Sequence, residues 1–109
     1  MARHHLTTTT DAVRILGQQI AAARRRQRRT ADEVAERAGV TRVTLRKIER
    51  GDPTVAIGLY FEAATVLAIP LFGRDGRELA ELAAQGQRDL ALLPARVRSS
   101  RAIETDDDF

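Results

Sequence analysis

Cysteine and tryptophan do not occur among the 109 residues of the chain, and aromatic residues make up only 4% of it. Without cysteine there is no disulfide bond and no cysteine-based zinc site or nucleophile. No apolar run approaches the roughly 20 residues that span a bilayer, and the first ten residues, MARHHLTTTT, lack the apolar segment of a signal peptide. We therefore expect a cytoplasmic protein with no membrane contact.

The same scarcity limits the chemistry of the chain. His4 and His5 have no neighbouring metal ligands, so the sequence predicts neither a metal site nor a histidine base. No nucleophile–base pair and no glycine-rich phosphate loop occurs. We therefore expect no cofactor and no enzymatic activity.

What remains for the core is Ala, Leu, Val and Ile, because there are so few aromatic residues. A core of this kind suits packed helices better than a sandwich of strands. At this length the chain has room for one compact domain with loose ends. The fold class that we predict is all-α.

Charge divides the chain into two halves. Residues 1–51 hold twelve basic and five acidic side chains, a balance of +7, whereas residues 52–109 hold six and ten, a balance of −4. Five of the arginines lie together between residues 24 and 29. A basic half joined to an acidic half predicts polyanion binding at one end and a different task at the other. The alternative is a solvated helix end, where cations favour the dipole.

The first three helices are predicted from spacing and caps. Residues 1–8 are expected to be disordered, and a helix is expected from Thr10 or Asp11 to about Gln27. Thr30 is the expected N-cap of the second helix, which Gly39 terminates. Thr41 is expected to cap the third helix, which ends at about residue 49 or 50 before a Gly-Asp-Pro turn.

Two further helices complete the pattern. In the fourth, Ile57, Tyr60, Ala64 and Leu67 are expected to close the core. A fifth helix, from about residue 77 to 93, has one apolar stripe. The stripe consists of Leu79, Leu82, Ala83, Gly86, Leu90 and Leu93. We therefore divide the chain into a disordered arm (1–8), a domain (9–93) and a flexible acidic tail (94–109).

The stretch from residue 31 to residue 50 has the spacing of a helix-turn-helix. Ala35 is small enough for two helices to cross, and Gly39 suits a turn with positive φ. Val40, Leu45 and Ile48 place apolar side chains under the second helix of the pair. This spacing predicts DNA binding.

Residues 16–69 resemble the lambda-repressor-like, or XRE, family of helix-turn-helix regulators. The segments that show this are LGQQIAAARRRQ, ADEVAERAGVTRVTLRKIERG and the helix after Asp52-Pro53. The resemblance implies a five-helix domain that binds an inverted-repeat operator in double-stranded DNA as a homodimer. The segment IERGDPTVAIGLYFEAATVLAI and the C-terminal ending resemble HipB-type proteins. These are repressor-antitoxins encoded beside HipA-like serine/threonine kinases. Such a protein would be bacterial and nucleoid-associated when bound.

In such proteins the third helix lies in the major groove with its N-terminal residues toward the base edges. Its outward-facing candidates for base contacts are Thr41, Arg42, Val43, Thr44 and Lys47. Arginine or lysine suits O6 and N7 of guanine, and valine suits a thymine methyl, although Val43 could instead pack inward. The candidates for phosphate contacts are Arg46, Arg50, Thr54, Thr30 and members of the arginine run from Arg25 to Arg29.

Two further positions follow from the resemblance. Arg24 and Glu49 match a buried ion pair that joins the first and third helices in related repressors. The family usually has a phosphate-binding glutamine where this chain has Ala31, so we expect a nearby arginine or Thr30 to replace that contact.

The dimer interface and the tail are open to two interpretations each. The fifth-helix stripe, with Leu59, Phe61 and Phe72, could form the dimer interface, or the stripe could pack on its own domain. The tail ends in Asp106, Asp107, Asp108 and Phe109. This ending is either a solvating acidic segment or a partner-binding anchor that folds on a kinase.

Four functions are compatible with the sequence, and we favour an autorepressor that is also the antitoxin of a HipA-like kinase. The second is a stand-alone repressor of phage or chromosomal origin, and the third is an interaction adaptor that has lost DNA binding. Enzymatic activity is the fourth and the least supported.

Overall fold

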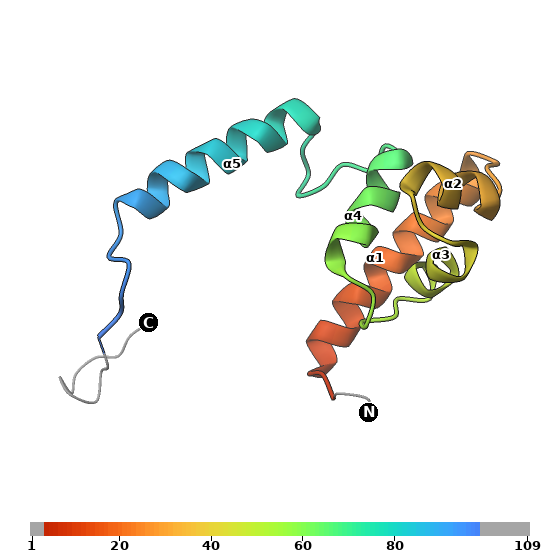
Figure 1. Ribbon diagram of the computed structural model, residues 1–109, viewed down its shortest axis with the longest axis horizontal. Coiled ribbons are helices and arrows are strands. Elements are labelled where there is room, and N and C mark those ends of the chain that lie inside the picture. The colour runs from red at the N-terminus through yellow and green to blue at the C-terminus, as the bar shows by residue number, and fades with distance from the viewer. Residues whose placement is uncertain (1–3, 99–109) are drawn as a thin grey trace. The chain divides into compact units, whose positions relative to one another are not determined.

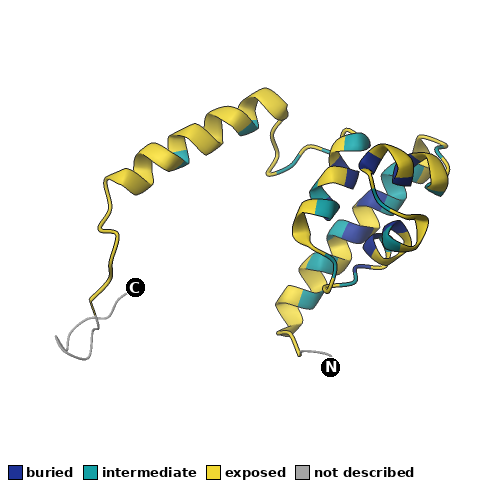
Figure 2. Cartoon of the chain, in the orientation of Figure 1, coloured by how far each residue is buried: buried dark blue, intermediate teal, exposed yellow. Residues whose placement is uncertain are grey.

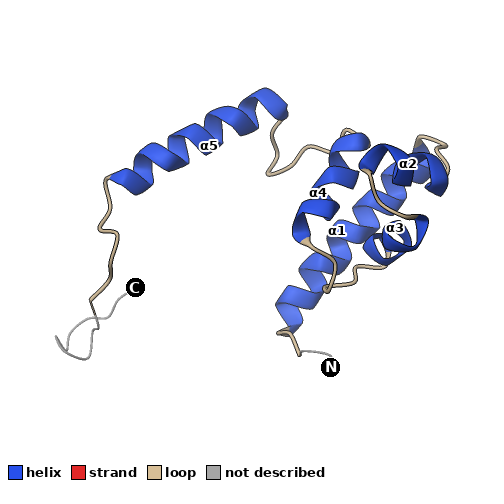
Figure 3. Cartoon of the chain, viewed as in Figure 1, coloured by secondary structure: helices blue, strands red, loops and turns tan. Residues whose placement is uncertain are grey.

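The computed structural model describes residues 4–98 of the chain, and these form five α-helices and no strand (Figure 3). The predicted all-α fold class and the number of helices are confirmed. The helices are α1 (Thr7–Arg26), α2 (Ala31–Ala38), α3 (Arg42–Glu49), α4 (Ile57–Val66) and α5 (Gly76–Ala91). The chain divides after Gly73 into two compact units, which are described separately.

The first unit is built from α1 to α4, which pack around one apolar core (Figures 1 and 2). Its fully buried large side chains come from all four helices and from the residue that ends α4. They are Ile20, Val34, Leu45, Ile48, Tyr60 and Leu67. Alanines fill the remaining space, since Ala35, Ala63 and Ala64 are also buried. Apart from Tyr60, the core is therefore aliphatic, as the composition predicts.

The predicted caps of α2 and α3 are confirmed. The Thr30 hydroxyl accepts a hydrogen bond from the Glu33 N–H at 3.1 Å. The Thr41 hydroxyl accepts one from the Thr44 N–H, also at 3.1 Å. Gly39 ends α2 with a φ of 73°, in the left-handed region that glycine adopts without strain. Gly39 and Thr41 therefore fix the two ends of the turn between α2 and α3, and Thr30 fixes the start of α2.

Two predictions about the helices need correction. α1 begins at Thr7, so Thr7 and Thr8 are helical and not disordered. No side chain caps this end; the Leu6 carbonyl accepts the Thr10 N–H at 3.1 Å, a backbone contact without a sequence signal. Ile57 is 58% exposed and lies outside the core, because it is the first residue of α4.

α1 crosses the turn after α3 at two glycines. A β-carbon on Gly17 would lie 2.4 Å from the Ile48 carbonyl oxygen and 2.9 Å from the Gly51 nitrogen. A β-carbon on Gly51 would lie 2.6 Å from the Arg14 α-carbon, and Gly51 has a φ of 75°. The two backbones therefore approach so closely that neither position has room for a side chain.

Donors from the link between α1 and α2 satisfy the carbonyl groups at the end of α4. The Gln27 side-chain amide donates to the Leu67 carbonyl at 2.8 Å, and the Arg29 guanidinium donates to the Val66 carbonyl at 3.0 Å. Unpaired carbonyls at a helix end are costly when partly buried. These two side chains therefore hold α4 against the rest of the first unit.

The second unit contains α5, which begins with a reciprocal capping box. The Asp75 carboxylate accepts the Glu78 N–H at 2.8 Å, and the Glu78 carboxylate accepts the Asp75 N–H at 3.0 Å. α5 buries none of its residues (Figure 2). Its apolar stripe is largely open to solvent, since Leu82 is 41% and Leu90 is 70% exposed.

Tyr60 connects α4 to the turn after α3, and it makes the stability of the first unit sensitive to alkaline pH. Tyr60 is 1% exposed, and its hydroxyl donates to the Asp52 carbonyl at 2.6 Å. Burial, assisted by the nearby Asp52 carboxylate, raises the pKa of Tyr60 to about 12. An unfolded tyrosine has a pKa of about 10, so the protonated phenol stabilises the folded state below pH 10. This stabilisation is lost as the pH rises from about 10 to about 12.

We expect the free energy of unfolding to fall by roughly 2–3 kcal/mol over this interval, and we expect Tyr60→Phe to remove that fall. Because Tyr60 is the single tyrosine of the chain, tyrosinate absorbance in a pH titration reports on this residue alone. Urea unfolding of both proteins at each pH gives the free energies. Equal alkaline slopes for the two proteins would show that other groups cause the loss.

Candidate nucleic-acid interface

α3 has one buried face and one exposed face. Leu45 and Ile48 are 0% exposed and anchor the helix in the core. The opposite face is open to solvent and includes most of the predicted DNA-contacting residues. Its exposed side chains are Arg42, Val43, Arg46 and Lys47. Val43 is 59% exposed, so it does not pack inward.

The first turn of α3 is held by its own threonines. The Thr41 hydroxyl donates to the Thr44 hydroxyl oxygen at 3.1 Å, in addition to accepting the Thr44 N–H. Thr41 is exposed and Thr44 is half-buried. Both hydroxyls therefore have partners within the protein. The main role of Thr41 in this structure is to cap the start of α3.

Arg42 has a loose partner on α2. Its Nε lies 3.5 Å from a carboxylate oxygen of Asp32, and the two side chains are 60% and 72% exposed. Exposed ion pairs of this kind contribute little to stability. Asp32 therefore keeps the Arg42 guanidinium near the start of α3 without preventing it from exchanging this carboxylate for another acceptor.

A bidentate ion pair joins α1 to the end of α3. Arg24 Nε lies 2.7 Å from one carboxylate oxygen of Glu49, and Arg24 Nη2 lies 3.1 Å from the other. The side chains are only 16% and 12% exposed. The hydrogen bonds that Arg24 donates to the Glu49 carboxylate raise the pKa of Arg24. This pair fixes the direction of α3 relative to α1, as the resemblance to related repressors implies.

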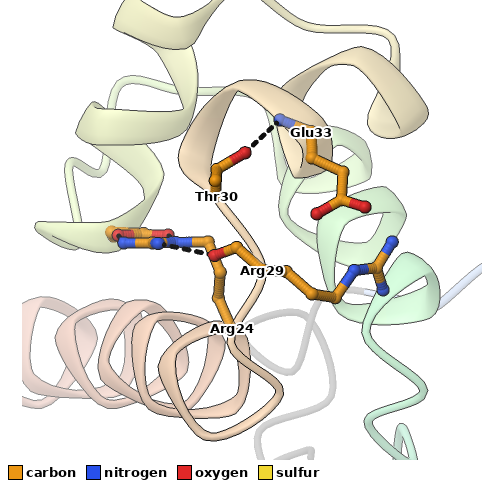
Figure 4. A network of polar contacts seen from close by, with 5 residues as sticks. Arg24, Arg29, Thr30 and Glu33 are labelled. Atoms are coloured by element: carbon orange, nitrogen blue, oxygen red, sulfur yellow. Dashed lines mark hydrogen bonds and ion pairs between the residues drawn. The ribbon is translucent and has the colours of Figure 1, made fainter.

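The third donor of Arg24 reaches the link before α2. Arg24 Nη1 donates to the Arg29 carbonyl at 3.0 Å, and the neighbouring Thr30 hydroxyl caps α2 (Figure 4). One guanidinium thus connects α1, the end of α3 and the start of α2. The helix-turn-helix is held by a polar network as well as by its apolar face.

Two of the predicted phosphate-contacting residues have partners within the protein. The Arg29 guanidinium donates to the Val66 carbonyl, so we assign it to the end of α4 and do not retain it among the proposed DNA contacts. The Thr54 hydroxyl donates to the Asp52 carboxylate at 2.6 Å, and this bond lowers the pKa of Asp52. Arg50, which follows α3, is exposed.

Three remaining expectations concern metal binding, membrane-spanning helices and the acidic tail. Among residues 4–98 no group of three or more acidic, histidine or cysteine side chains could hold a metal ion. No helix in this part of the chain is long and apolar enough to cross a membrane. The proposed partner-binding residues Asp106, Asp107, Asp108 and Phe109 lie outside the described residues.

Comparison with known proteins identifies the segment that contains this site. Residues 20–73 match the model of the family described as helix-turn-helix. No curated protein matches the chain. The matched segment begins within α1, includes the whole of α2 to α4 and ends at the boundary of the first unit. Residues 20–73 are therefore similar to a helix-turn-helix domain.

Proposed function

We propose that this chain is a transcriptional repressor that reads an operator with the exposed face of α3. The observation that supports this best is the contrast between the two faces of the helix: Leu45 and Ile48 are fully buried, whereas Arg42, Arg46 and Lys47 extend from the opposite face. An exposed basic helix held rigidly by an ion pair matches the requirement for major-groove reading.

The residues divide into those that read bases and those that position the protein. Arg42 lies at the start of α3, where a bidentate contact with guanine O6 and N7 specifies sequence. Val43 offers an apolar contact to a thymine methyl, and Lys47 reaches a further base or a phosphate. Arg46 and Arg50 neutralise phosphates and provide affinity without sequence information.

Replacing Arg42 with alanine tests this assignment. We expect binding to the operator, selected from a random-sequence library, to weaken roughly 10-fold to 100-fold, since a bidentate base contact contributes about 1–3 kcal/mol. Binding to a scrambled duplex of equal length should weaken much less. Fluorescence anisotropy with both duplexes, at the same salt concentration, measures the difference.

Arg14→Ala is the matched control, because Arg14 forms a similarly exposed pair with Asp11 at 3.4 Å on α1. It should leave the ratio between operator and scrambled duplex unchanged. Equal losses on both duplexes with Arg42→Ala would show that Arg42 contacts only phosphate. If the wild-type protein shows no salt-dependent binding at about 0.1 M salt, the adaptor alternative replaces the repressor.

The repressor is proposed to act as a homodimer on an inverted repeat. Helix-turn-helix dimers bind two half-sites about 34 Å apart, which requires an interface between two copies. The exposed apolar side chains of α5, with Leu82 and Leu90 on its stripe, are available for this contact. Phe72 is 71% exposed and provides a further apolar surface in the first unit.

The antitoxin role is a narrower proposal. Its support is the resemblance of the segment after α3 to HipB-type proteins and the acidic ending of the chain. A HipA-like kinase encoded by the neighbouring gene would support it. A neighbouring gene of another kind would favour the stand-alone repressor.

A further inference from the structure

A hollow of about 440 Å³ lies along α1, beside the residues that follow α4. A row of α1 side chains forms one wall, and Ile69 and Pro70 form the other. Five of its eight lining residues are apolar, among them Ala22 near its centre. Ile15 lies at one end of the row and is 53% exposed. An apolar hollow along a helix is the kind of surface on which the apolar face of another helix packs.

α5 has an apolar face without a surface to cover. It buries none of its residues, and Leu82 and Leu90 on its stripe are 41% and 70% exposed. Isolated helices shorter than about 15 residues are marginal in water, and most helical stability comes from packing. At 16 residues, α5 therefore gains stability mainly by packing its stripe against another helix.

The row on α1 and the stripe on α5 have the same spacing. From Ile15 the row continues three, four, seven and eleven residues on, and from Leu79 the stripe continues at the same intervals. Each therefore extends about 17 Å along its helix. In antiparallel packing Leu90 lies opposite Ile15, and Ala83 lies opposite Ala22. Two small side chains at this crossing allow the helix axes to approach closely.

The charges favour the antiparallel direction, which brings the start of α5 to the end of α1. Arg26 lines the end of the hollow, and Glu81 lies in the first half of α5. Neither takes part in an ion pair within residues 4–98. Parallel packing would instead bring Arg88 toward Arg26. Charges that flank the apolar seam of two helices set their orientation, so Arg26 and Glu81 select the antiparallel arrangement.

The link between α4 and α5 favours a second copy of the chain as the source of the helix. Phe72 in this link has a φ of 52°, in the left-handed region that is unfavourable for a bulky side chain. Short links under backbone strain favour the exchange of an element between identical chains, because the link can straighten in the exchanged form.

We propose that the hollow on α1 is the docking site for α5 of a second copy of this chain, which packs antiparallel to α1. Each copy offers one hollow and one stripe, so exchange in both directions gives a symmetric dimer. This inference rests on the homodimer of the proposed function and deepens it. It assigns α5 to α1 of the other copy and not to the other α5.

Ala22→Arg tests the hollow, because it places a long charged side chain at its centre. We expect the dimer dissociation constant of the full chain, measured by sedimentation equilibrium, to rise roughly tenfold or more, since a buried charge without a partner is costly. Ala12→Arg is the matched control: Ala12 is an exposed residue of α1 that does not line the hollow. Equal dissociation constants for the two variants would overturn the proposal.

Disulfide trapping shows which helices meet, because the chain contains no cysteine. Tagged Ala22→Cys chains and untagged Ala83→Cys chains are unfolded together in urea, refolded as a mixture and oxidised. We expect a mixed disulfide between the two variants, and none when Ala12→Cys replaces Ala22→Cys. Disulfides only between two Ala83→Cys chains would show that α5 packs on α5. That outcome, or the absence of the mixed product, would overturn the proposal even if Ala22→Arg failed to fold.

A duplex with a single half-site separates this proposal from the proposed repressor. Ala22→Arg should bind the half-site as tightly as the wild-type protein, and it should bind the inverted repeat more weakly. A wild-type protein that stays monomeric would overturn the exchange, whereas its half-site binding would still support reading by α3. A wild-type protein that gives the mixed disulfide but binds no DNA would support the exchange and contradict the repressor.

Discussion

Replacing Gly17 with alanine is expected to destabilise the protein by about 3 kcal/mol or more, near the upper end of the range for overpacked sites. In a solvent-exposed helix this substitution stabilises, because alanine has the higher helix propensity by about 1 kcal/mol. In α1 the new methyl group would lie 2.4 Å from the Ile48 carbonyl oxygen. Both clashing groups are backbone, so relief requires α1 to move away from the end of α3.

The matched control is Gly58→Ala in α4, where a β-carbon would meet nothing within 4 Å. We expect this control to be neutral or to stabilise by up to about 1 kcal/mol. Urea unfolding of the three proteins gives the free energies. A neutral Gly17→Ala would mean that α1 and the turn after α3 are farther apart than the structure places them.

The second large effect is expected at the ion pair between Arg24 and Glu49. Glu49→Leu leaves the Arg24 guanidinium only 16% exposed and without its carboxylate. Breaking a buried pair in this way costs about 3–5 kcal/mol. Because both side chains retain some solvent contact, we expect a loss near 3 kcal/mol in the free energy of unfolding.

The double variant Arg24→Met with Glu49→Leu should be more stable than either single variant, because no charge remains stranded. Arg24→Lys should not restore the wild-type value, since lysine lacks the fork that binds both carboxylate oxygens and the Arg29 carbonyl. A complete thermodynamic cycle measures the coupling between the two positions. If the two single losses simply add, the pair does not hold α1 and α3 together.

The parts of this fold that can be predicted from sequence are those with local causes. The hydroxyl groups of Thr30 and Thr41 cap the starts of α2 and α3, and the backbone angle of Gly39 ends α2. The residue type alone is enough to predict each of these helix ends. The buried positions Leu45 and Ile48 follow from helical spacing. The buried and exposed faces of α3 could therefore be predicted, except at Val43, whose direction the sequence left open, and at Thr44, which was expected to face outward and is half-buried.

The parts that were missed depend on distant neighbours. Gly17 resembles any glycine in a helix until the approach of Gly51 is known. Arg29 resembles the arginines beside it, yet its guanidinium binds the end of α4, 37 residues later in the chain. Spacing within one helix contains no information about such contacts. The sequence alone therefore does not distinguish an arginine that is available for DNA from one that binds a carbonyl within the protein.

The exposure of α5 has a consequence for denaturation measurements. The urea dependence of unfolding and its heat-capacity change both scale with the surface exposed on unfolding. α5 buries none of its residues in the single chain, so its melting adds little to either quantity. For a monomer, both values should resemble those of a domain about as long as residues 1–73. If α5 joins two copies, both values should instead increase with protein concentration as the dimer forms.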